Sequence, residues 1–302
     1  MMENDSCFLT VLTPTFNRKD KLPRLADSLN AQTDKEFQWL VIDDGSSDHT
    51  DEYIRQFQPQ GFSVDYRYKE NGGKHTALNY AHPYIKGSYV CVVDSDDTLT
   101  PDAVATIRDA ILTCGKDPML ACFSFQRGIN PNNALVKGMP DVPVISNHID
   151  FRLNGGRFGD CCEVVRTDVL EAYPFPEFSG EHFISEGYFW VQMAKKYKTY
   201  YCSRIIYLCQ YEEGGLTKSG RGMRLQSPLG GMAVCNAFLS ARKKPRLCVR
   251  LTLKQTWMYI CYGKYAGLSY RRMKKKCERP GLMTLNYPIG LLIYQIFRRK
   301  YG

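Results

Sequence analysis

The chain has 302 residues, a net charge of +9 and 44% apolar side chains, so it can form one large or two modest domains and is not a disordered polypeptide. Twelve cysteines are present, but no two have the Cys-x-x-Cys spacing of zinc sites and thioredoxin-like redox motifs. The first residues lack the basic and apolar regions of a secretory signal, so we expect a reducing cytoplasm and free, mostly buried thiols.

The positive charge is concentrated toward the C-terminal end. From residue 242 onward there are sixteen Lys and Arg residues and a single acid, Glu278, which gives this part a charge of +15 and leaves −6 for the rest. Such asymmetry indicates an anionic partner, either a membrane surface or a nucleic acid. No helix-turn-helix, zinc-finger or RNP-type motif supports nucleic-acid binding. We therefore expect an anionic membrane surface and no nucleic acid.

The first hundred residues alternate between apolar strands and amphipathic helices. Strands are predicted at residues 8–13, 37–42, 64–68 and 89–93, with helices at 19–32, 50–57 and 76–85 between them. This alternation predicts an α/β fold, with a Rossmann-like, mostly parallel sheet flanked by helices. A polar cluster follows each strand, and the carboxyl ends of parallel strands share one edge of the sheet. The four clusters are therefore expected to meet in one crevice.

The remainder of the chain predicts fewer strands and more helices. Further strands are expected at 119–126, 161–166 and 199–211, a surface loop at 128–147 and a helix at 186–196. A Gly-rich stretch at 214–220 closes the first domain, so the predicted domains are 1–215 and 216–302. The second is a C-terminal, basic helical extension, with helices near 223–241, 245–264, 269–276 and 289–300.

Three carboxylates, those of Asp94, Asp96 and Asp97, directly follow the apolar strand at 89–93. Ionised carboxylates next to a core are costly unless they are paired or bind a cation. Their hard oxygen ligands suit Mg²⁺ or Mn²⁺. The alternative is a solvated turn in which Asp97 or Thr100 caps the next helix. That turn explains only one or two of the three acids, and this stretch alone leaves both interpretations open.

Two other clusters carry groups suited to a nucleotide. Asp43 and Asp44 end the second strand, where a carboxylate can accept hydrogen bonds from ribose hydroxyls or a base N–H. The alternative is an Asx-turn with a helix cap, which we favour for Asp48. Residues 71–75, Asn-Gly-Gly-Lys-His, open a helix. Their glycines allow close approach of a phosphate and Lys74 supplies a charge, although the spacing is not that of a P-loop.

Four short motifs occur in a fixed order within these hundred residues. They are residues 13–18 (TPTFNR), 41–48 (VIDDGSSD), 71–74 (NGGK) and 94–97 (DSDD). In order and spacing they resemble the family 2 glycosyltransferases, which have the GT-A fold. The resemblance implies inverting transfer of a hexosyl or N-acetylhexosaminyl group from a nucleotide-diphosphate sugar, a UDP-sugar above all, to a glycan or lipid-linked acceptor. It also implies a divalent cation, Mn²⁺ or Mg²⁺.

The resemblance also implies roles for individual residues. The nucleotide sugar would be bound by Pro14, Thr15, Asn17, Asp43, Asp44, Gly73, Lys74, Asp94 and Ser95. Asp94 and Asp96, with Asp97 beside them, would bind the cation. The family usually has its catalytic base in a Glu-Asp pair ahead of a helix, and here that place reads Ser-Glu-Gly at 185–187. Glu186 is therefore the expected base, with Glu181 as the alternative.

Two departures from the family pattern affect the expected function. The broken Glu-Asp pair leaves open a non-catalytic nucleotide-sugar-binding or scaffold protein. A Gln-x-x-Arg-Trp motif, typical of processive members, is absent after the expected base. Its absence favours addition of a single sugar over synthesis of a long homopolymer. We expect a role in cell-surface polysaccharide or lipid-linked glycan synthesis.

The uncharged stretch at 281–297 bears on where the protein acts. It is shorter than the roughly 20 apolar residues of a spanning helix and contains Pro288. Together with the basic residues around it, the stretch predicts an interfacial helix at the inner face of the cell membrane, so that the protein is cytoplasmic and peripheral. The alternative is ordinary packing against the catalytic domain.

Overall fold

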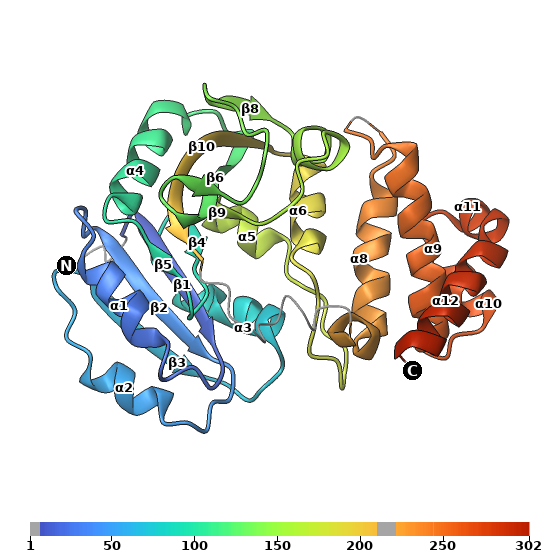
Figure 1. Ribbon diagram of the computed structural model, residues 1–302, viewed down its shortest axis with the longest axis horizontal. Coiled ribbons are helices and arrows are strands. Elements are labelled where there is room, and N and C mark those ends of the chain that lie inside the picture. The colour runs from blue at the N-terminus through green and yellow to red at the C-terminus, as the bar shows by residue number, and fades with distance from the viewer. Residues whose placement is uncertain (1–6, 210–221, 244, 302) are drawn as a thin grey trace. The chain divides into compact units, whose positions relative to one another are not determined.

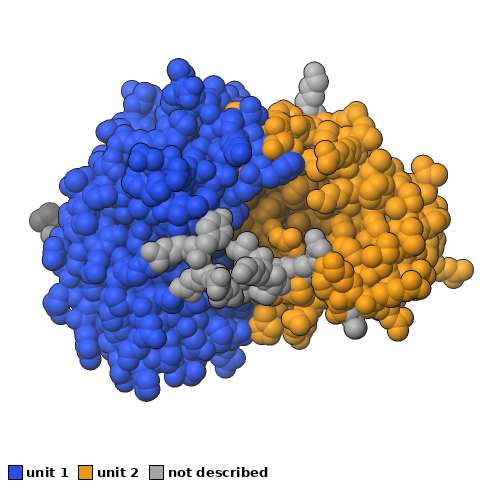
Figure 2. All heavy atoms as spheres, in the orientation of Figure 1, with its two compact units in different colours: residues 1–146, 157–174, 197–211 blue, residues 147–156, 175–196, 212–302 orange. Residues whose placement is uncertain are grey.

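The computed structural model describes residues 7–209, 222–243 and 245–301 (Figure 1). The predicted domain boundary at 215 and the Gly-rich stretch at 214–220 lie outside these residues. The chain folds into two compact units (Figure 2). Unit 1 comprises residues 1–146, 157–174 and 197–211, and unit 2 comprises 147–156, 175–196 and 212–302.

Unit 1 is an α/β structure built on one mixed sheet (Figure 1). Its strands are β1 (Leu9–Thr15), β2 (Phe37–Asp43), β3 (Ser63–Tyr68), β4 (Tyr89–Val92), β5 (Thr98–Leu99), β6 (Leu120–Asn130), β7 (Asn133–Ala134), β8 (Val144–Ser146), β9 (Cys161–Arg166) and β10 (Lys198–Leu208). Its helices are α1 (Leu22–Asn30), α2 (Thr50–Gln56), α3 (Lys74–Ala81), the short 3₁₀ helix η1 (His82–Tyr84), α4 (Ala103–Cys114) and α5 (Thr167–Ala172). The predicted fold class is confirmed.

The strand order is β3-β2-β1-β4-β9-β6-β10-β5. The first four strands of the chain pair in parallel, as the alternation of strands and helices predicts. β9 differs, because it runs antiparallel to both β4 and β6. β6 and β10 then pair in parallel again. The carboxyl ends of β1 to β4 consequently share one edge, which is where the polar clusters lie.

Helices cover both faces of this sheet because the strands are apolar on both sides. Alternate side chains of β1 and β2, including Val11 and Trp39, are buried in one core with Leu25 of α1 and Ile107 of α4. The intervening side chains, such as Leu12, point to the opposite face, and α3 contacts β1 and β2. Burial on both faces is typical of parallel strands with a continuous apolar run.

The segment predicted as a surface loop, 128–147, is more ordered than expected. β6 continues to Asn130, and the segment contains the short strands β7 and β8. The physical reason is a buried amide: Gln126 donates a hydrogen bond to the Val136 carbonyl (2.9 Å) and accepts one from its N–H (3.3 Å). Val136 is itself buried. Most of the segment is exposed, as predicted, but the prediction missed these strands because Gly, Asn and Pro content carries no information about such an anchor.

Unit 2 is helical and has its own core. It contains η2 (Ile149–Asn154), α6 (Gly187–Ala194), α8 (Pro228–Ser240), α9 (Val249–Tyr265), α10 (Tyr270–Lys276), α11 (Pro280–Leu285) and α12 (Tyr287–Tyr301). α9 packs against both α8 and α12, and its buried residues Tyr259 and Ile260 belong to a core that includes Met232 and Met273. Among the residues that the structure describes, no helix has the length and apolar character needed to cross a membrane.

The uncharged stretch at 281–297 contains two helices, of which α11 was not predicted. The break between them falls at Asn286, which accepts a hydrogen bond from Trp257 Nε1 (2.9 Å) and donates one to the Leu282 carbonyl (3.0 Å). Pro288 lies in the first turn of α12, where a proline is tolerated because it needs no N–H partner. The buried amide of Asn286 and this proline together explain the interruption.

Candidate active site

The candidate active site lies in unit 1, at the carboxyl edge of the parallel strands. Thr15 at the end of β1 pairs with Asp43 at the end of β2, and Asp43 pairs with Tyr68 at the end of β3. β4 ends at Val92, which pairs with Leu12, and the acids at 94–97 follow beside the last residues of β1. The sheet therefore brings the four polar clusters to one edge, as ligand-binding residues are arranged in open α/β sheets.

Asp43 anchors the turn that follows β2. Its buried carboxylate accepts hydrogen bonds from the Ser46 N–H (2.7 Å) and the Tyr66 hydroxyl (2.7 Å). Burial and this carboxylate raise the pKa of Tyr66, so the tyrosine stays a proton donor. Gly45 makes the turn possible, since it has φ +90° and a Cβ there would lie 2.8 Å from the Asn71 nitrogen.

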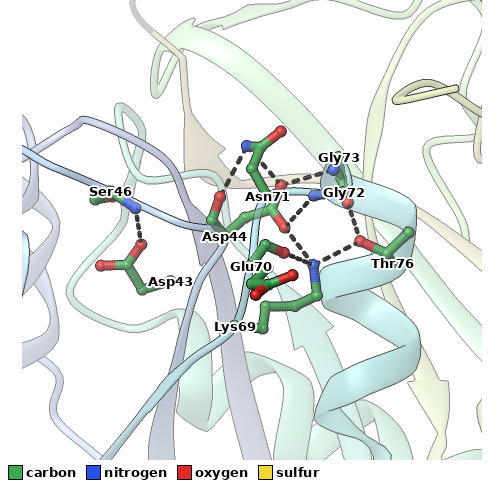
Figure 3. A network of polar contacts seen from close by, with 9 residues as sticks. All are labelled: Asp43, Asp44, Ser46, Lys69, Glu70, Asn71, Gly72, Gly73 and Thr76. Atoms are coloured by element: carbon green, nitrogen blue, oxygen red, sulfur yellow. Dashed lines mark hydrogen bonds and ion pairs between the residues drawn. The ribbon is translucent and has the colours of Figure 1, made fainter. Parts of the chain in front are cut away.

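Asp44 organises the glycine loop after β3 (Figure 3). Its buried carboxylate accepts hydrogen bonds from Lys69 Nζ (2.6 Å), the Gly72 N–H (3.0 Å) and the Gly73 N–H (2.7 Å). Asn71 Nδ2 adds contacts to the Asp44 carbonyl (2.8 Å) and carboxylate (3.2 Å). The carboxylate that the motif suggested for nucleotide contact is thus occupied, in this structure, in holding residues 69–73.

Asp94 sits between two cations. Lys74, the first residue of α3, donates to one carboxylate oxygen at 2.6 Å, and Arg127 of β6 approaches the other at 3.4 Å. Burial alone would raise the pKa of Asp94. Lys74 and Arg127 outweigh burial and hold the pKa of this carboxyl well below its ordinary value. Asp94 therefore remains ionised at any ordinary pH.

Asp97 lies in a different environment from Asp94. Its carboxylate accepts a hydrogen bond from the Tyr207 hydroxyl (2.8 Å), and Arg127 is 3.9 Å away. Burial, together with the charges of Asp94 and Asp96, raises the pKa of Asp97 to about 6, against the lowering effects of Tyr207 and Arg127. Tyr207 also accepts a hydrogen bond from the Asp94 N–H (3.0 Å), so it links the two acids.

The end of β1 contributes two further residues. Asn17 has a left-handed backbone (φ 51°), and its carbonyl Oδ1 accepts a hydrogen bond from the Ser47 N–H (2.8 Å). This contact joins the loops after β1 and β2. Thr15 is buried, and its hydroxyl has no hydrogen-bond partner among the described residues. A buried hydroxyl without a partner is costly, so Thr15 is suited to receive a ligand's polar group.

The acids after β4 are suited to bind a divalent cation when a diphosphate supplies the rest of its oxygen ligands. Among the described residues, no group of three or more Asp, Glu, His or Cys side chains converges as a metal cage. Mg²⁺ is usually held by one or two carboxylates, with substrate phosphates and water completing the shell. Asp94 and the partly exposed Asp96 supply such oxygens. The residues thus fit a cation shared with a diphosphate and do not form a preformed cage.

The two glutamates considered as catalytic base lie in unit 2. Glu181 accepts hydrogen bonds from the Leu229 N–H (2.8 Å) and the Gly230 N–H (2.7 Å), at the amino end of α8. Gly230 permits this approach, because a Cβ there would lie 2.8 Å from the Phe183 carbonyl. The Glu181 carboxylate is therefore a helix cap. Glu186 immediately precedes α6, at its N-cap position.

Three residues of the site were not predicted from the sequence: Lys69, Arg127 and Tyr207. Lys69 directly follows β3, so its place beside the glycine loop was a signal that could have been used. Arg127 lies in β6 and Tyr207 in β10, two strands that mix apolar and polar residues. A charged residue such as Arg127 is unusual within a largely buried strand, but nothing in the sequence identifies its partner. Of the other predicted residues, Pro14 lies in β1, Gly73 directly precedes α3, and Ser95 lies between β4 and β5.

Comparison with known proteins identifies the family of this chain. A glycine loop and a carboxylate cluster lie at the carboxyl edge of the sheet, where open α/β sheets bind their ligands. The family model for glycosyl transferase family 2 matches residues 10–162, half of the chain. The chain therefore belongs to glycosyl transferase family 2, which confirms the resemblance seen in its motifs.

Relatives support the family at the level of sequence. The chain is 34% identical over 139 residues to a chondroitin synthase of Pasteurella multocida. The aligned segment covers 46% of this chain and 14% of that protein. It is 28% identical over 205 residues to the GalNAc(5)-diNAcBac-PP-undecaprenol beta-1,3-glucosyltransferase of Campylobacter jejuni, covering 66% of this chain and 63% of that protein. The matched segment thus spans about a seventh of the length of the first relative.

Solved structures support the fold. S. aureus TarS 1-349, crystallised in complex with UDP-GlcNAc, superposes with a TM-score of 0.57 at 17% identity over 97% of this chain and 92% of that chain. The mannosyltransferase PcManGT from Pyrobaculum calidifontis, in complex with GDP-Man and Mn²⁺, gives a TM-score of 0.56 at 16% identity, covering 98% and 83%. At these identities the likeness concerns the GT-A fold alone.

The role of Asp44 leads to a stability prediction. Asp44→Ala leaves the Lys69 ammonium, whose side chain is only 15% exposed, without its carboxylate and the loop N–H groups without an acceptor. Removing one partner of a buried ion pair costs about 3–5 kcal/mol, so the free energy of unfolding should fall by that amount in urea titrations. The control is Asp51→Ala, which removes an exposed pair with Arg55 and should cost about 0.5 kcal/mol. Equal losses in the two variants would contradict the structural role of Asp44.

Proposed function

We propose that this protein is an inverting, metal-dependent glycosyltransferase that uses a nucleotide-diphosphate sugar. The observation that carries the proposal is the meeting of three charged groups at the sheet edge, where Lys74 and Arg127 lie 2.6 Å and 3.4 Å from the Asp94 carboxylate. Two cations there can neutralise a leaving diphosphate, and the carboxylates can share a divalent cation with it. Family membership supports this assignment over a non-catalytic sugar-nucleotide-binding protein.

The donor is proposed to be a UDP-sugar carrying a hexosyl or N-acetylhexosaminyl group. The TarS neighbour binds UDP and UDP-GlcNAc, and the PcManGT neighbour binds GDP-Man with Mn²⁺, which supports a nucleotide sugar and a Mn²⁺ or Mg²⁺ ion. In this chain Asp43 and the unpartnered Thr15 hydroxyl would contact the nucleoside, with Pro14 and Asn17 shaping the loop. Lys74 would contact the diphosphate.

The acceptor is proposed to be a glycan or lipid-linked hydroxyl. The Campylobacter jejuni relative is a glucosyltransferase acting on an undecaprenol-linked glycan by its name, and the Pasteurella multocida relative is a polysaccharide synthase. Both fit a role in lipid-linked glycan or cell-surface polysaccharide synthesis. Addition of one sugar per event is the form we propose, since the processive motif is absent from the sequence.

The proposed chemistry divides between charge neutralisation and proton removal. When bound, the divalent cation would lower the charge of the leaving diphosphate. Asp94 and Asp96 would hold that cation. Lys74 and Arg127 would leave the Asp94 carboxylate and contact the diphosphate oxygens instead. Glu186 would take the acceptor hydroxyl's proton as the new bond forms. Glu181 is less suited to this step, since its carboxylate caps α8.

The metal assignment is tested with Asp96→Ala. We expect Mn²⁺-stimulated hydrolysis of UDP-sugars and Mn²⁺-dependent donor binding to be lost, while the unfolding midpoint stays unchanged, because Asp96 is partly exposed. Asp109→Ala, another acid exposed on unit 1, serves as the matched control. Unaltered Mn²⁺-dependent turnover in Asp96→Ala would remove Asp96 from the proposal.

The base assignment is tested with Glu186→Gln, which keeps the side chain's shape and removes its basicity. Loss of a positioned base typically lowers the rate by about 10²–10⁴-fold, so we expect that loss in kcat with donor affinity retained. Glu181→Gln should instead lower thermal stability, because it weakens the cap of α8, and leave kcat within a fewfold of the parent. The reverse pattern would make Glu181 the base.

We further propose that unit 2 attaches the protein to an anionic membrane surface. α12 exposes Ile289, Leu292 and Ile296, each with 44–56% of its surface accessible, and their spacing of three and four residues places them on one helix face. Arg298, Arg299 and Lys300 follow in the last turn. An apolar stripe bordered by cations is typical of interfacial helices.

Vesicle sedimentation tests the membrane proposal. Replacing Ile289, Leu292 and Ile296 together with Ser should lower the partition coefficient onto acidic vesicles by about tenfold or more, because apolar burial is lost. The control replaces Ile129 and Val142, which are exposed on unit 1, with Ser. If the α12 variant sediments with vesicles as well as this control does, α12 is not the membrane contact.

A further inference from the structure

A pocket of about 440 Å³ on unit 2 is lined by three arginines, Arg242, Arg246 and Arg279, together with residues 280–282 at the start of α11. It takes no part in the candidate active site, whose nucleotide and metal groups all lie in unit 1. Its wall combines guanidinium groups with the small residues Pro280 and Gly281. Neither the motifs nor the proposed transfer reaction uses these residues.

Arg279 is fixed by the end of a helix. Its Nε donates to the Leu239 carbonyl (2.8 Å) and an Nη to the Ala241 carbonyl (3.2 Å), so it caps the C-terminal end of α8. A cation at this end interacts favourably with the helix dipole. The guanidinium makes no ion pair with a carboxylate among the described residues. Its position is thus set by backbone carbonyls, while its charge is left without a carboxylate counterion.

Arg246 is held through its backbone. Asn154 donates to the Arg246 carbonyl (2.8 Å) and accepts a hydrogen bond from the Cys248 N–H (2.8 Å). Leu247, between them, is buried in a core with Ile149. The side chain of Arg246 is exposed and makes no ion pair with any residue that the structure describes. Its backbone is therefore anchored next to the pocket, and only the side chain has freedom.

The pocket has an excess of positive charge. Its nearest carboxylate is that of Glu278, 3.8 Å from Arg242, and both of these side chains are about half exposed. A pair at that distance and exposure contributes little. Burial, followed by the charges of Arg242 and Arg246, lowers the pKa of Arg279. The three guanidinium groups therefore repel one another, and a bound anion would relieve that repulsion.

We propose that the pocket formed by Arg242, Arg246 and Arg279 binds a phosphate or diphosphate group, as an anion site separate from the proposed donor site. Planar guanidinium groups present paired N–H donors that match phosphate oxygens. The hydrogen bonds that fix the Arg279 guanidinium lower the ordering cost of binding. A soluble phosphate and the headgroup of a phospholipid present the same chemistry. The proposal stands whether or not the protein transfers a sugar.

The test compares two charge-matched double variants of the full chain. Arg242→Gln with Arg246→Gln alters the pocket and leaves the helix cap by Arg279 intact. Arg271→Gln with Arg272→Gln removes two exposed cations of α10, outside the pocket. Both leave unit 1 unchanged, so any anion binding at the donor site is common to the two. Unfolding midpoints equal to that of the parent confirm that each variant is folded.

Calorimetric titration with inorganic pyrophosphate, without divalent cations, is the first arm. We expect the pocket variant to bind about tenfold or more weakly than the control, the loss that follows removal of a charge-assisted hydrogen bond. The second arm is sedimentation with phosphatidylcholine vesicles containing phosphatidic acid. A defect confined to the vesicle arm identifies a lipid headgroup as the ligand, and a defect in the pyrophosphate arm identifies a soluble phosphate group.

The proposal is overturned if the pocket variant matches the Arg271→Gln/Arg272→Gln control in both arms. Equal weakening of both variants relative to the parent has the same meaning, because it shows that binding follows total charge rather than the pocket. Retained pyrophosphate binding together with retained vesicle binding likewise assigns the three arginines to packing and helix capping alone.

Discussion

The ionised carboxylate of Asp94 is the constraint on which the arrangement of the active site depends. Such a group is stable beside the core only when cations and hydrogen-bond donors compensate for lost hydration. Lys74 comes from the start of α3 and Arg127 from β6, two strands away in the sheet. Arg127 also donates to the carbonyl of Cys161 on the intervening strand β9 (2.9 Å). Because β9 lies between β4 and β6, it sets the distance that the Arg127 side chain spans to reach Asp94.

This arrangement has a consequence for the proposed reaction. When no ligand is bound, Lys74 and Arg127 neutralise the charge of Asp94. A leaving diphosphate would require the same two cations. In the proposed reaction, Asp94 would help to hold the cation, and Lys74 and Arg127 would be free to contact the phosphate oxygens. The local charge would then stay balanced before and after donor binding, so little reorganisation is needed. Asp97 differs from Asp94 because the Tyr207 hydroxyl, rather than a close cation, is its nearest partner.

Two neighbouring aspartates in one motif have different functions for a geometric reason. Asp43 is the last residue of β2 and binds the turn after it. Asp44 lies one residue further, so its side chain points to the next loop and accepts hydrogen bonds from Gly72, Gly73 and Lys69. The glycine loop is consequently ordered by a carboxylate before any ligand binds. A preformed loop lowers the conformational cost of binding a phosphate.

The sequence predicts the local elements of this site and the edge on which they meet. Apolar runs place β1 to β4, and parallel pairing brings Asp43, the glycine loop and Asp94 to one end of the sheet. It does not predict Arg127 or Tyr207 as partners of Asp94, since these are 33 and 113 residues away, and their contacts depend on the order of strands. Periodicity specifies a strand and its buried face but not which strand lies beside it.

The same limit applies to the glutamates and to the buried amides. A sequence shows two acids near the start of a predicted helix, but the capping contacts of Glu181 involve Leu229 and Gly230, some fifty residues later. Gln126 and Asn286 likewise stop or anchor chain segments through side-chain hydrogen bonds that composition does not reveal. The sequence therefore fails to predict contacts between polar side chains and distant partners. The apolar pattern does predict the strands and helices.

The basic character of unit 2 shows the same distinction at the level of charge. Net charge counts every Lys and Arg equally, but the structure separates two kinds. The guanidinium of Arg279 is fixed by backbone carbonyls and the backbone of Arg246 is anchored, whereas Lys274, Lys275 and Lys276 are exposed on the last turn of α10. Exposed, flexible cations attract any anionic surface within a Debye length, and salt screens that attraction. A fixed guanidinium such as that of Arg279 instead selects for the geometry of a phosphate, because its donors are already oriented before the phosphate binds.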